Sequence, residues 1–241
     1  MFPIFVKELN VFLRSLMAYV IMGFFSLLMG LWMWVFPETN VLDGGYADLQ
    51  PLFRLGPYVL MLLVPAVTMH MFAEEKRAGT LELLLTTPLT VPQLVLGKYL
   101  ASWFILLLTL LLTSVYYVTV YSLASPVGNI DTAAVLGSYL GLLLLAGVFA
   151  AIGLCMSSLT AHQLVAFLLS VLLCFLLYQG FDAWMTLQTW EHYSLWLAQL
   201  GLRYHYDALR RGVIDSRDLL YFAGMATLLL WTTMQVLYRR Q

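Results

Sequence analysis

The side chains that could hold a metal ion or act as nucleophiles are few in this chain of 241 residues. Its histidines are His70, His162, His192 and His205. No two of them stand four residues apart, the spacing at which a single helix presents two histidines to zinc. Cys155 and Cys174 lie within apolar runs, where a cysteine usually serves packing. We therefore expect no catalytic residue, no metal site and no cofactor held by this chain.

The segment most similar to a phosphate-binding loop is the pair Gly97-Lys98. Tyr99 follows where that motif needs Ser or Thr, and Pro92 stands where it needs its first glycine. Such a loop binds phosphate through a set of backbone N–H groups at a helix start, and this segment does not provide it. We therefore expect that the chain does not hydrolyse ATP and is not an enzyme.

The composition is that of an integral membrane protein. Hydrophobic residues make up 62% of the chain and charged residues 10%, whereas a soluble domain has roughly 45–50% and about 25%. The formal net charge of −1 also excludes a nucleic-acid partner bound through a broad basic surface.

Five stretches of the sequence are free of Asp, Glu, Lys and Arg, and a membrane-crossing helix needs about 20 apolar residues. The longest is divided by a polar break at 157–163. We therefore predict an all-α integral membrane protein, with residues 1–241 forming one transmembrane domain. Its six spans are expected near 19–36, 57–72, 99–121, 134–156, 164–181 and 219–237. Pro57 and Pro65 are expected to start and to kink the second span.

The orientation of the chain in the membrane is predicted from the positions of its basic residues. Six spans place both termini on one side, and the segments on that side hold seven of the 12 Lys and Arg residues. Four of the other five lie in one long loop, which counts less in the positive-inside rule. No charged residue lies deep in a predicted span, which argues against a proton relay or a charged ion filter. We predict N-in and C-in.

Residues 1–18 are predicted to form an amphipathic elbow helix that lies on the inner membrane surface and contacts lipid. Its apolar face would consist of Phe2, Phe5, Val6, Leu9, Phe12 and Leu13, and its polar face of Lys7, Asn10 and Arg14. The alternative is a plain cytosolic extension of the first span.

Residues 74–90 predict a hairpin that contains a short cytosolic helix. Gly79 would break the second span, and Thr80 would cap the new helix. Glu82 would lie in the first turn of that helix, and Pro88 would end it. Thr90 and Gln93 then match a capping box, so the next helix should begin near Val91.

The short helix would be apolar through Leu81, Leu84 and Leu85. It is either an interfacial connector whose leucines face lipid or a docking site for a cytosolic partner. Physical reasoning alone favours neither.

The segment Glu-Glu-Lys-Arg-Ala-Gly-Thr-Leu-Glu-Leu-Leu-Leu-Thr-Thr-Pro-Leu at 74–89, followed by Gly97-Lys98, resembles the coupling-helix signature of ABC-2 type transporter permeases. Residues 211–222 are similar to the matching region of the gliding-motility permeases and of the related nitrous-oxide-reductase maturation permease.

This resemblance implies a six-helix ABC-2 fold of the type V exporter kind in a bacterial inner membrane, with an elbow helix, a coupling helix and outer re-entrant helices at 182–218. It implies a cytosolic ABC ATPase subunit that holds ATP and magnesium, a second permease copy or paralogue, and an auxiliary membrane subunit with a large extracytoplasmic domain. The coupling residues it implies are Glu74, Glu75, Lys76, Arg77, Gly79, Thr80, Leu81, Glu82, Leu85 and Pro88.

The loop before the last span is aromatic, and 195–211 predicts a helix ended by Gly212. Asp215 should cap the last span. Five charged residues form a candidate outer-face interaction site: Arg210, Arg211, Asp215, Arg217 and Asp218. Together with Asp207, they either form a solvated salt-bridge cluster that fixes the turn or contact a partner or cargo outside the membrane.

Taken together, the sequence predicts a permease subunit that couples ATP hydrolysis in its partner to transport or force transmission, with gliding motility as one use. The alternative is a non-transporting membrane scaffold or assembly subunit. An intramembrane enzyme is less favoured, because the spans offer no set of nucleophile, base or metal ligands.

Overall fold

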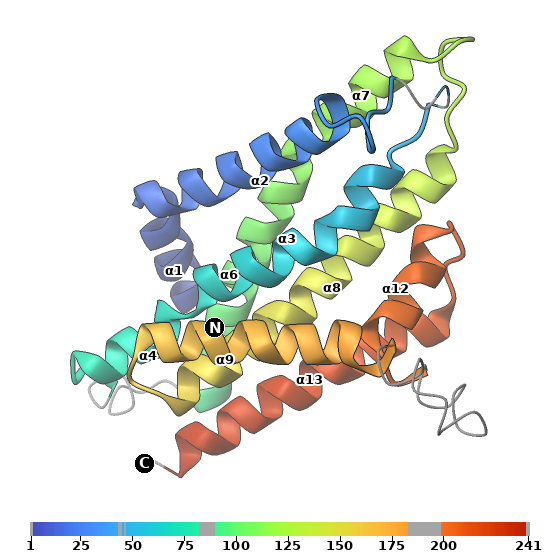
Figure 1. The fold of residues 1–241 in the computed structure, drawn as a ribbon. Helices are drawn as coiled ribbons and strands as arrows, with labels where there is room; N and C mark the ends of the chain where they lie inside the picture. The colour runs from blue at the N-terminus through green and yellow to red at the C-terminus, as the bar shows by residue number, and fades with distance from the viewer. Residues whose placement is uncertain (1, 43–44, 46, 82–89, 183–198, 240–241) are drawn as a thin grey trace.

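A computed structural model of the chain describes residues 2–42, 45, 47–81, 90–182 and 199–239. Every regular element in these ranges is a helix, as Figure 1 shows. Six helical segments of the described chain are long and apolar enough to cross a membrane. The predicted all-α fold with six spans is therefore confirmed.

The helices alternate between long spans and short elements at their ends. They are α1 (Phe2–Arg14), α2 (Leu16–Trp34), α3 (Gln50–Thr68), α4 (His70–Arg77), α6 (Val91–Leu112), α7 (Ser114–Leu123), α8 (Thr132–Leu159), α9 (Gln163–Phe175), the π-helical turn η1 (Leu176–Gly180), α12 (Leu202–Arg210) and α13 (Ser216–Tyr238). The candidate spans are Leu16–Trp34, Gln50–Arg77, Val91–Leu123, Thr132–Leu159, Gln163–Gly180 and Ser216–Tyr238.

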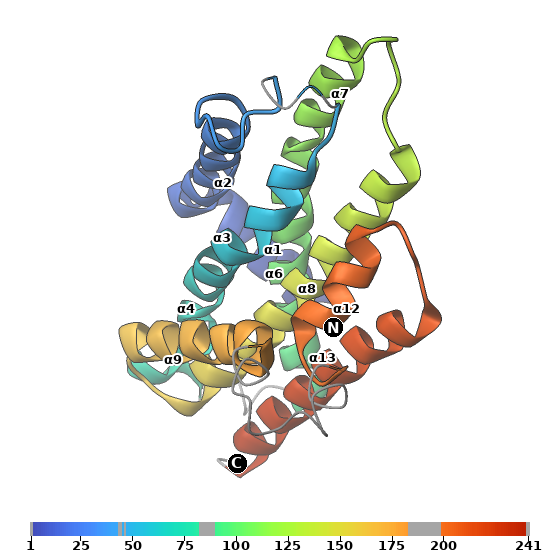
Figure 2. The same cartoon turned by 45° about the vertical axis from the view of Figure 1, so that its right-hand side comes forward.

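Helix α8 lies at the centre of the bundle and packs against α3, α9, α12 and α13 (Figures 1 and 2). Its small residues permit this close packing. A Cβ built on Gly153 would lie 1.8 Å from Thr68 Oγ1 of α3, and one on Gly137 would lie 2.9 Å from the carbonyl oxygen of Leu209. These glycines therefore serve contacts within the chain.

The second span differs most from its prediction. It begins at Gln50 rather than at Pro57, with a proline in its first turn, and both Pro57 and Pro65 lie inside α3. The charge-free criterion missed this start because Arg54 lies within the helix. A kink was predicted at Pro65, and the helix is instead interrupted a few residues later, where α3 ends at Thr68 and α4 begins at His70.

The bundle has two ends that differ in what they hold. At one end lie α1, α4, the turn at Gly79 and the connection between α8 and α9, and the C-terminal end of α13 points the same way (Figure 1). We call this the hairpin end. At the other lie the first turn of α3, the end of α7, the first turns of α8 and the last turn of α12. We call this the α12 end.

Candidate coupling site

The turn that follows α4 is built as the sequence predicted. α4 ends at Arg77, and Gly79 has a φ of +68°, a left-handed conformation that favours glycine. After the hairpin, Thr90 and Gln93 form the predicted capping box, and α6 begins at Val91.

The predicted coupling helix is described only in its first turn. Thr80 and Leu81 are helical, and the Thr80 hydroxyl donates back to the carbonyl of Glu75 at 3.3 Å. We predicted that the Thr80 side chain caps the helix by accepting a hydrogen bond from an N–H group beyond residue 81, and those residues are not described. Glu82, Leu85 and Pro88 likewise lie outside the described residues.

The predicted coupling residues that are described divide into an exposed and an inward-facing set. Glu74, Arg77, Gly79 and Thr80 are exposed. Leu81 is only 5% exposed and belongs to the hydrophobic core, so it is not available on a free docking surface. Glu75 and Lys76 point toward other helices.

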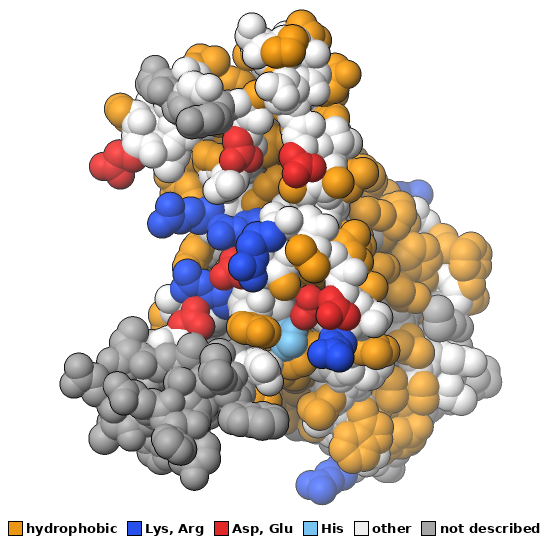
Figure 3. Space-filling view, turned by 90° about the vertical axis from the view of Figure 1, so that its right-hand side faces the viewer, with side chains coloured by type: hydrophobic (Ala, Val, Ile, Leu, Met, Phe, Trp, Pro, Cys, Tyr) orange, Lys and Arg blue, Asp and Glu red, His pale blue; other side chains and the backbone are white. Residues whose placement is uncertain are grey.

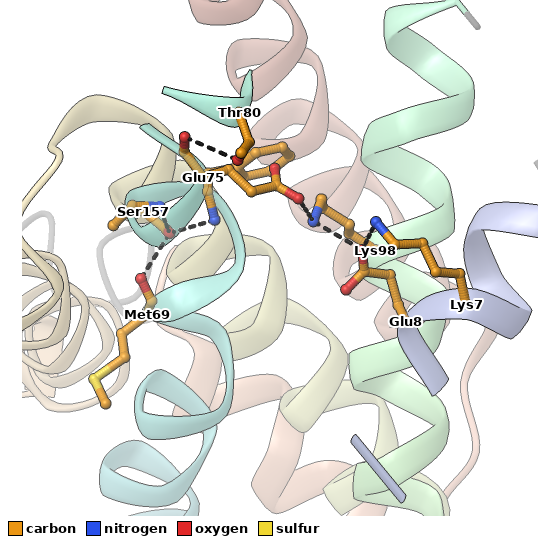
Figure 4. Close-up of polar contacts among 9 residues, drawn as sticks. Lys7, Glu8, Met69, Glu75, Thr80, Lys98 and Ser157 are labelled. Atoms are coloured by element: carbon orange, nitrogen blue, oxygen red, sulfur yellow. Dashed lines mark hydrogen bonds and ion pairs between the residues drawn. The ribbon is translucent and has the colours of Figure 1, made fainter. Parts of the chain in front are cut away.

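Glu75 takes part in a buried charge cluster that joins three helices (Figure 4). The Nζ of Lys98 on α6 lies 2.7 Å from Glu75 Oε1 on α4 and 3.0 Å from Glu8 Oε1 on α1. Lys98 is 1% exposed, and its ammonium also lies 5.3 Å from the centre of the Phe72 ring. We call Glu8, Glu75 and Lys98 the charge triad.

Electrostatics makes the triad depend on all its members. Two carboxylates flank the Lys98 ammonium, and the exposed Lys7 reaches Glu8 only at 3.9 Å. A buried charge that loses its partner costs about 3–5 kcal/mol of stability. Among the described residues, Glu75 Oε2 is buried with no hydrogen-bond partner. Lys98 is thus the cation that Glu75 pairs with in the described chain and the nearer of the two that contact Glu8.

Sequence reasoning missed Glu8 and considered Lys98 together with Gly97, first as a possible phosphate-binding pair and then as part of the family signature. The buried residues of α1 are Ile4, Glu8 and Phe12, which repeat every four residues and so form one stripe along the helix. That spacing was the signal available, because an acid in the middle of an apolar stripe needs a cationic partner.

A second set of contacts ties α4 to α8. Ser157 Oγ accepts hydrogen bonds from the N–H groups of Phe72 and Ala73, both at 3.0 Å, and donates to the carbonyl of Met69 at 2.8 Å. Lys76 Nζ donates to the carbonyl of Ser158. The first N–H groups of a helix have no hydrogen-bond acceptor within that helix. In α4, the Ser157 hydroxyl is the acceptor for two of these groups. α4 is therefore held by α1 and α6 through the triad and by α8 through Ser157.

At the opposite end, α12 is shorter than the predicted helix at 195–211. It begins at Leu202 and ends at Arg210, while 195–198 are not described. Gly212 has a φ of +79°, as expected for the residue that ends this helix. The Tyr206 hydroxyl donates a hydrogen bond to the carbonyl of Phe53 at 2.6 Å, and this contact joins α12 to α3. Burial raises the pKa of Tyr206 well above its usual value.

The five predicted outer-face residues do not form one cluster. Arg210 Nη2 lies 3.5 Å from Asp207, and Arg211 Nε donates to the Asp207 carbonyl. Asp215 caps α13 by accepting from the N–H of Arg217 at 3.0 Å, as predicted. Of the expected salt-bridge cluster, the described residues show the pair Arg210–Asp207, while Arg211 and Asp215 contact backbone groups nearby in the chain. Contact with a partner outside the membrane stays a prediction.

Asp218 is the exception, since it is 7% exposed and lies 2.6 Å from Nδ1 of His205. The same imidazole contacts the carbonyl of Gln199 through Nε2 at 2.8 Å and stacks on Tyr221 with ring centres 3.9 Å apart. This pair joins α12 to α13. Within the described ranges, no three His, Cys, Asp or Glu side chains come together as a metal site requires.

Figure 3 shows the side of the molecule nearest α12, where acidic and basic side chains alternate over the surface beside hydrophobic ones. The two ends thus offer two kinds of site. A short helix held by buried polar contacts leads into a hairpin at one end, and a polar surface lies over α12 at the other.

An all-helical bundle of six candidate spans with this pattern is a multi-pass membrane protein. The family model for ABC-2 family transporter proteins matches residues 45–188, more than half of the chain. The chain therefore belongs to the ABC-2 family of transporter proteins and is a permease component rather than a catalytic ATPase. Membership implies a cytosolic ABC ATPase as partner. No curated protein matches the chain.

Proposed function

We propose that this chain is the transmembrane subunit of an ABC transporter in a bacterial inner membrane, and that 74–90 dock on its ATPase. The observation that carries this proposal is the attachment of α4. This helix leads directly into the hairpin, and the triad and Ser157 fix it to α1, α6 and α8.

The proposed coupling runs from the hairpin tip into the bundle. The ATPase would contact the exposed side chains of Glu74, Arg77 and Thr80. A displacement of the tip would move α4 as one body, because buried charge pairs separate only at high cost. Lys98 would pass the displacement to α6 and Glu8 to α1, while Ser157 would pass it to the central helix α8. Gly79 would be the pivot between tip and bundle.

The proposed orientation places the hairpin end and both termini in the cytosol. Its support is the distribution of Lys and Arg among the short loops. In this orientation α1 lies at the inner membrane surface and α12 faces the other compartment, as outer re-entrant helices would.

The finer assignment rests on the resemblance of residues 211–222 alone. From it we propose an assembly of the gliding-motility kind, with a second permease copy or a paralogue and an auxiliary subunit with an extracytoplasmic domain. The energy of ATP, bound with magnesium in the partner, would drive transport or mechanical work.

The proposal is tested by purifying the tagged chain from its native membrane in mild detergent and assaying vanadate-sensitive ATP hydrolysis. We expect an ATPase to co-purify and to be lost or uncoupled in Arg77→Glu and Gly79→Pro variants. Arg211→Glu, an equal charge reversal at the α12 end, is the matched control and should keep it. A chain that arrives without ATPase, under conditions that preserve other membrane complexes, would overturn the proposal and favour the membrane scaffold.

A further inference from the structure

A cavity of about 620 Å³ opens at the α12 end, among α2, α3, α7 and α8. This volume lies in the range of small-molecule sites, roughly 300–1,000 Å³. It is lined by Trp34 at the end of α2, Gln50 at the start of α3 and Leu123 at the end of α7. Because these residues are the ends of spans, the cavity lies where lipid headgroups meet the hydrocarbon core.

Charges of both signs line this cavity, and they come from three parts of the chain. Asp48 precedes α3, Asp131 precedes α8 and Arg210 ends α12. Each carboxylate uses its Oδ1 to cap a helix start, Asp48 for Gln50 N–H and Asp131 for Ala134 N–H. Neither forms an ion pair with any described residue, and Arg210 has only the 3.5 Å contact with Asp207. The cavity therefore offers unpaired negative charge beside a guanidinium.

A separate apolar groove of about 380 Å³ runs between α6, α7 and α8. Val135 lines both spaces, so the groove adjoins the polar cavity. The hydroxyls of Tyr117 and Thr132 share a hydrogen bond of 3.1 Å, and that of Tyr139 donates to the Thr113 carbonyl at 3.1 Å. The phenol and threonine groups of the groove are thus already engaged, and its remaining lining favours hydrocarbon.

The length of the groove matches one leaflet of a bilayer. Its lining on α8 extends from Thr132 to Leu143, which is about 16 Å at about 1.5 Å per residue. Half of a hydrocarbon core that is about 30 Å thick is about 15 Å. A headgroup in the polar cavity could therefore place an acyl chain along the groove.

We propose that the polar cavity and the apolar groove together bind one aminophospholipid, with a phosphatidylethanolamine headgroup. The ammonium lies between Asp48 and Asp131, the phosphate contacts Arg210, and one acyl chain fills the groove. A primary ammonium suits this cavity better than a choline group, because its N–H groups donate to the carboxylates. An anionic headgroup without an amine would leave both carboxylates unpaired.

The test is native mass spectrometry of the full chain, purified and delipidated in detergent and titrated with phosphatidylethanolamine, phosphatidylcholine or phosphatidylglycerol of the same acyl chains. We expect one tightly bound phosphatidylethanolamine, with a Kd about tenfold lower than for the other two lipids, a ratio that corresponds to about 1.4 kcal/mol. Equal binding of the three lipids, or no one-to-one complex, would overturn the proposal.

Variants locate the site. The double variant Asp48→Asn/Asp131→Asn keeps both helix caps, since asparagine caps as well as aspartate, and should remove the preference for phosphatidylethanolamine. Asp215→Asn, which changes a capping aspartate outside the cavity, is its control and should keep it. If the double variant keeps the preference, the ammonium site is not here.

Arg210→Gln should weaken all three phospholipids about equally, whereas its neighbour Arg211→Gln should not. Leu140→Trp fills the groove and should also weaken all three, while Leu164→Trp on the exposed side of α9 is its control. Unchanged lipid binding in both Arg210→Gln and Leu140→Trp would exclude this cavity and groove as the site. The helix-capping double variant decides the case if Leu140→Trp does not fold.

Discussion

At the hairpin end, three charged side chains from three helices are buried against one another, whereas at the α12 end the charges other than Asp218 lie at or near the surface or line an open cavity. Lys98 is 1% exposed and depends on Glu8 and Glu75. Arg203 and Asp182 at the other end are 36% and 30% exposed and lie 2.9 Å apart. Buried charges hold helices in a fixed relation, while exposed ones contribute little to stability and stay available to a ligand.

The largest effect is expected from Lys98→Met, which would leave Glu75 without a cation among the described residues and Glu8 with only the 3.9 Å contact to the exposed Lys7. We expect a loss of about 3–5 kcal/mol in the free energy of unfolding, measured by denaturant titration in detergent micelles. The triple variant Lys98→Met/Glu8→Gln/Glu75→Gln should recover much of that loss. A single variant as stable as the wild type would show that the triad does not hold α1 and α4 to α6.

Gly153→Ala tests the close contact of the central helix with the broken second span. Its Cβ would lie 1.8 Å from Thr68 Oγ1, so the helices must separate, and we expect a loss of about 3 kcal/mol by the same titration. Gly23→Ala, where a Cβ would meet nothing within 4 Å, is the matched control. If the two variants are equally stable, the contact is looser than described.

Ser157→Ala removes the hydroxyl that accepts from two N–H groups of α4. Because those buried donors would be left without a partner, we expect a loss of about 2 kcal/mol. Faster hydrogen exchange at Phe72 and Ala73, followed by mass spectrometry, should accompany it. Ser158→Ala serves as the control, since that hydroxyl donates to the Cys155 carbonyl of its own helix. An effect of the same size in both variants would count against a specific tie to α4.

The smallest effect is expected at the surface of the α12 end. Arg203→Gln breaks a partly exposed pair with Asp182 and a weaker one with Asp207, and it should cost less than about 1 kcal/mol, with a further decrease in cost at high salt. A loss as large as that of Lys98→Met would remove the contrast between the two ends.

Local features could be predicted from the sequence because their partners are close in the chain. The capping box at Thr90, the cap at Asp215 and the glycine turns at Gly79 and Gly212 each involve residues within a few positions of one another. Five charge-free stretches, the longest divided by a polar break, were enough to predict six spans, because the membrane fixes the length of a crossing helix.

Contacts between distant segments could not be predicted in the same way. Glu8 and Lys98 are 90 positions apart, and the local sequence around either residue does not indicate that the two are in contact. The start of the second span was missed because Arg54 breaks the charge-free pattern although the helix continues through it. Leu81 looked available for docking, yet packing places it in the core.

The order of the triad in the chain has a consequence for synthesis. Glu8 and Glu75 both leave the ribosome before Lys98, so each acid reaches the membrane before the buried cation that they share. α1 and α4 can therefore take up their final packing only after the start of α6 has been made. Assembly of the hairpin end is in this sense a late event, completed when the third span arrives rather than as each helix inserts.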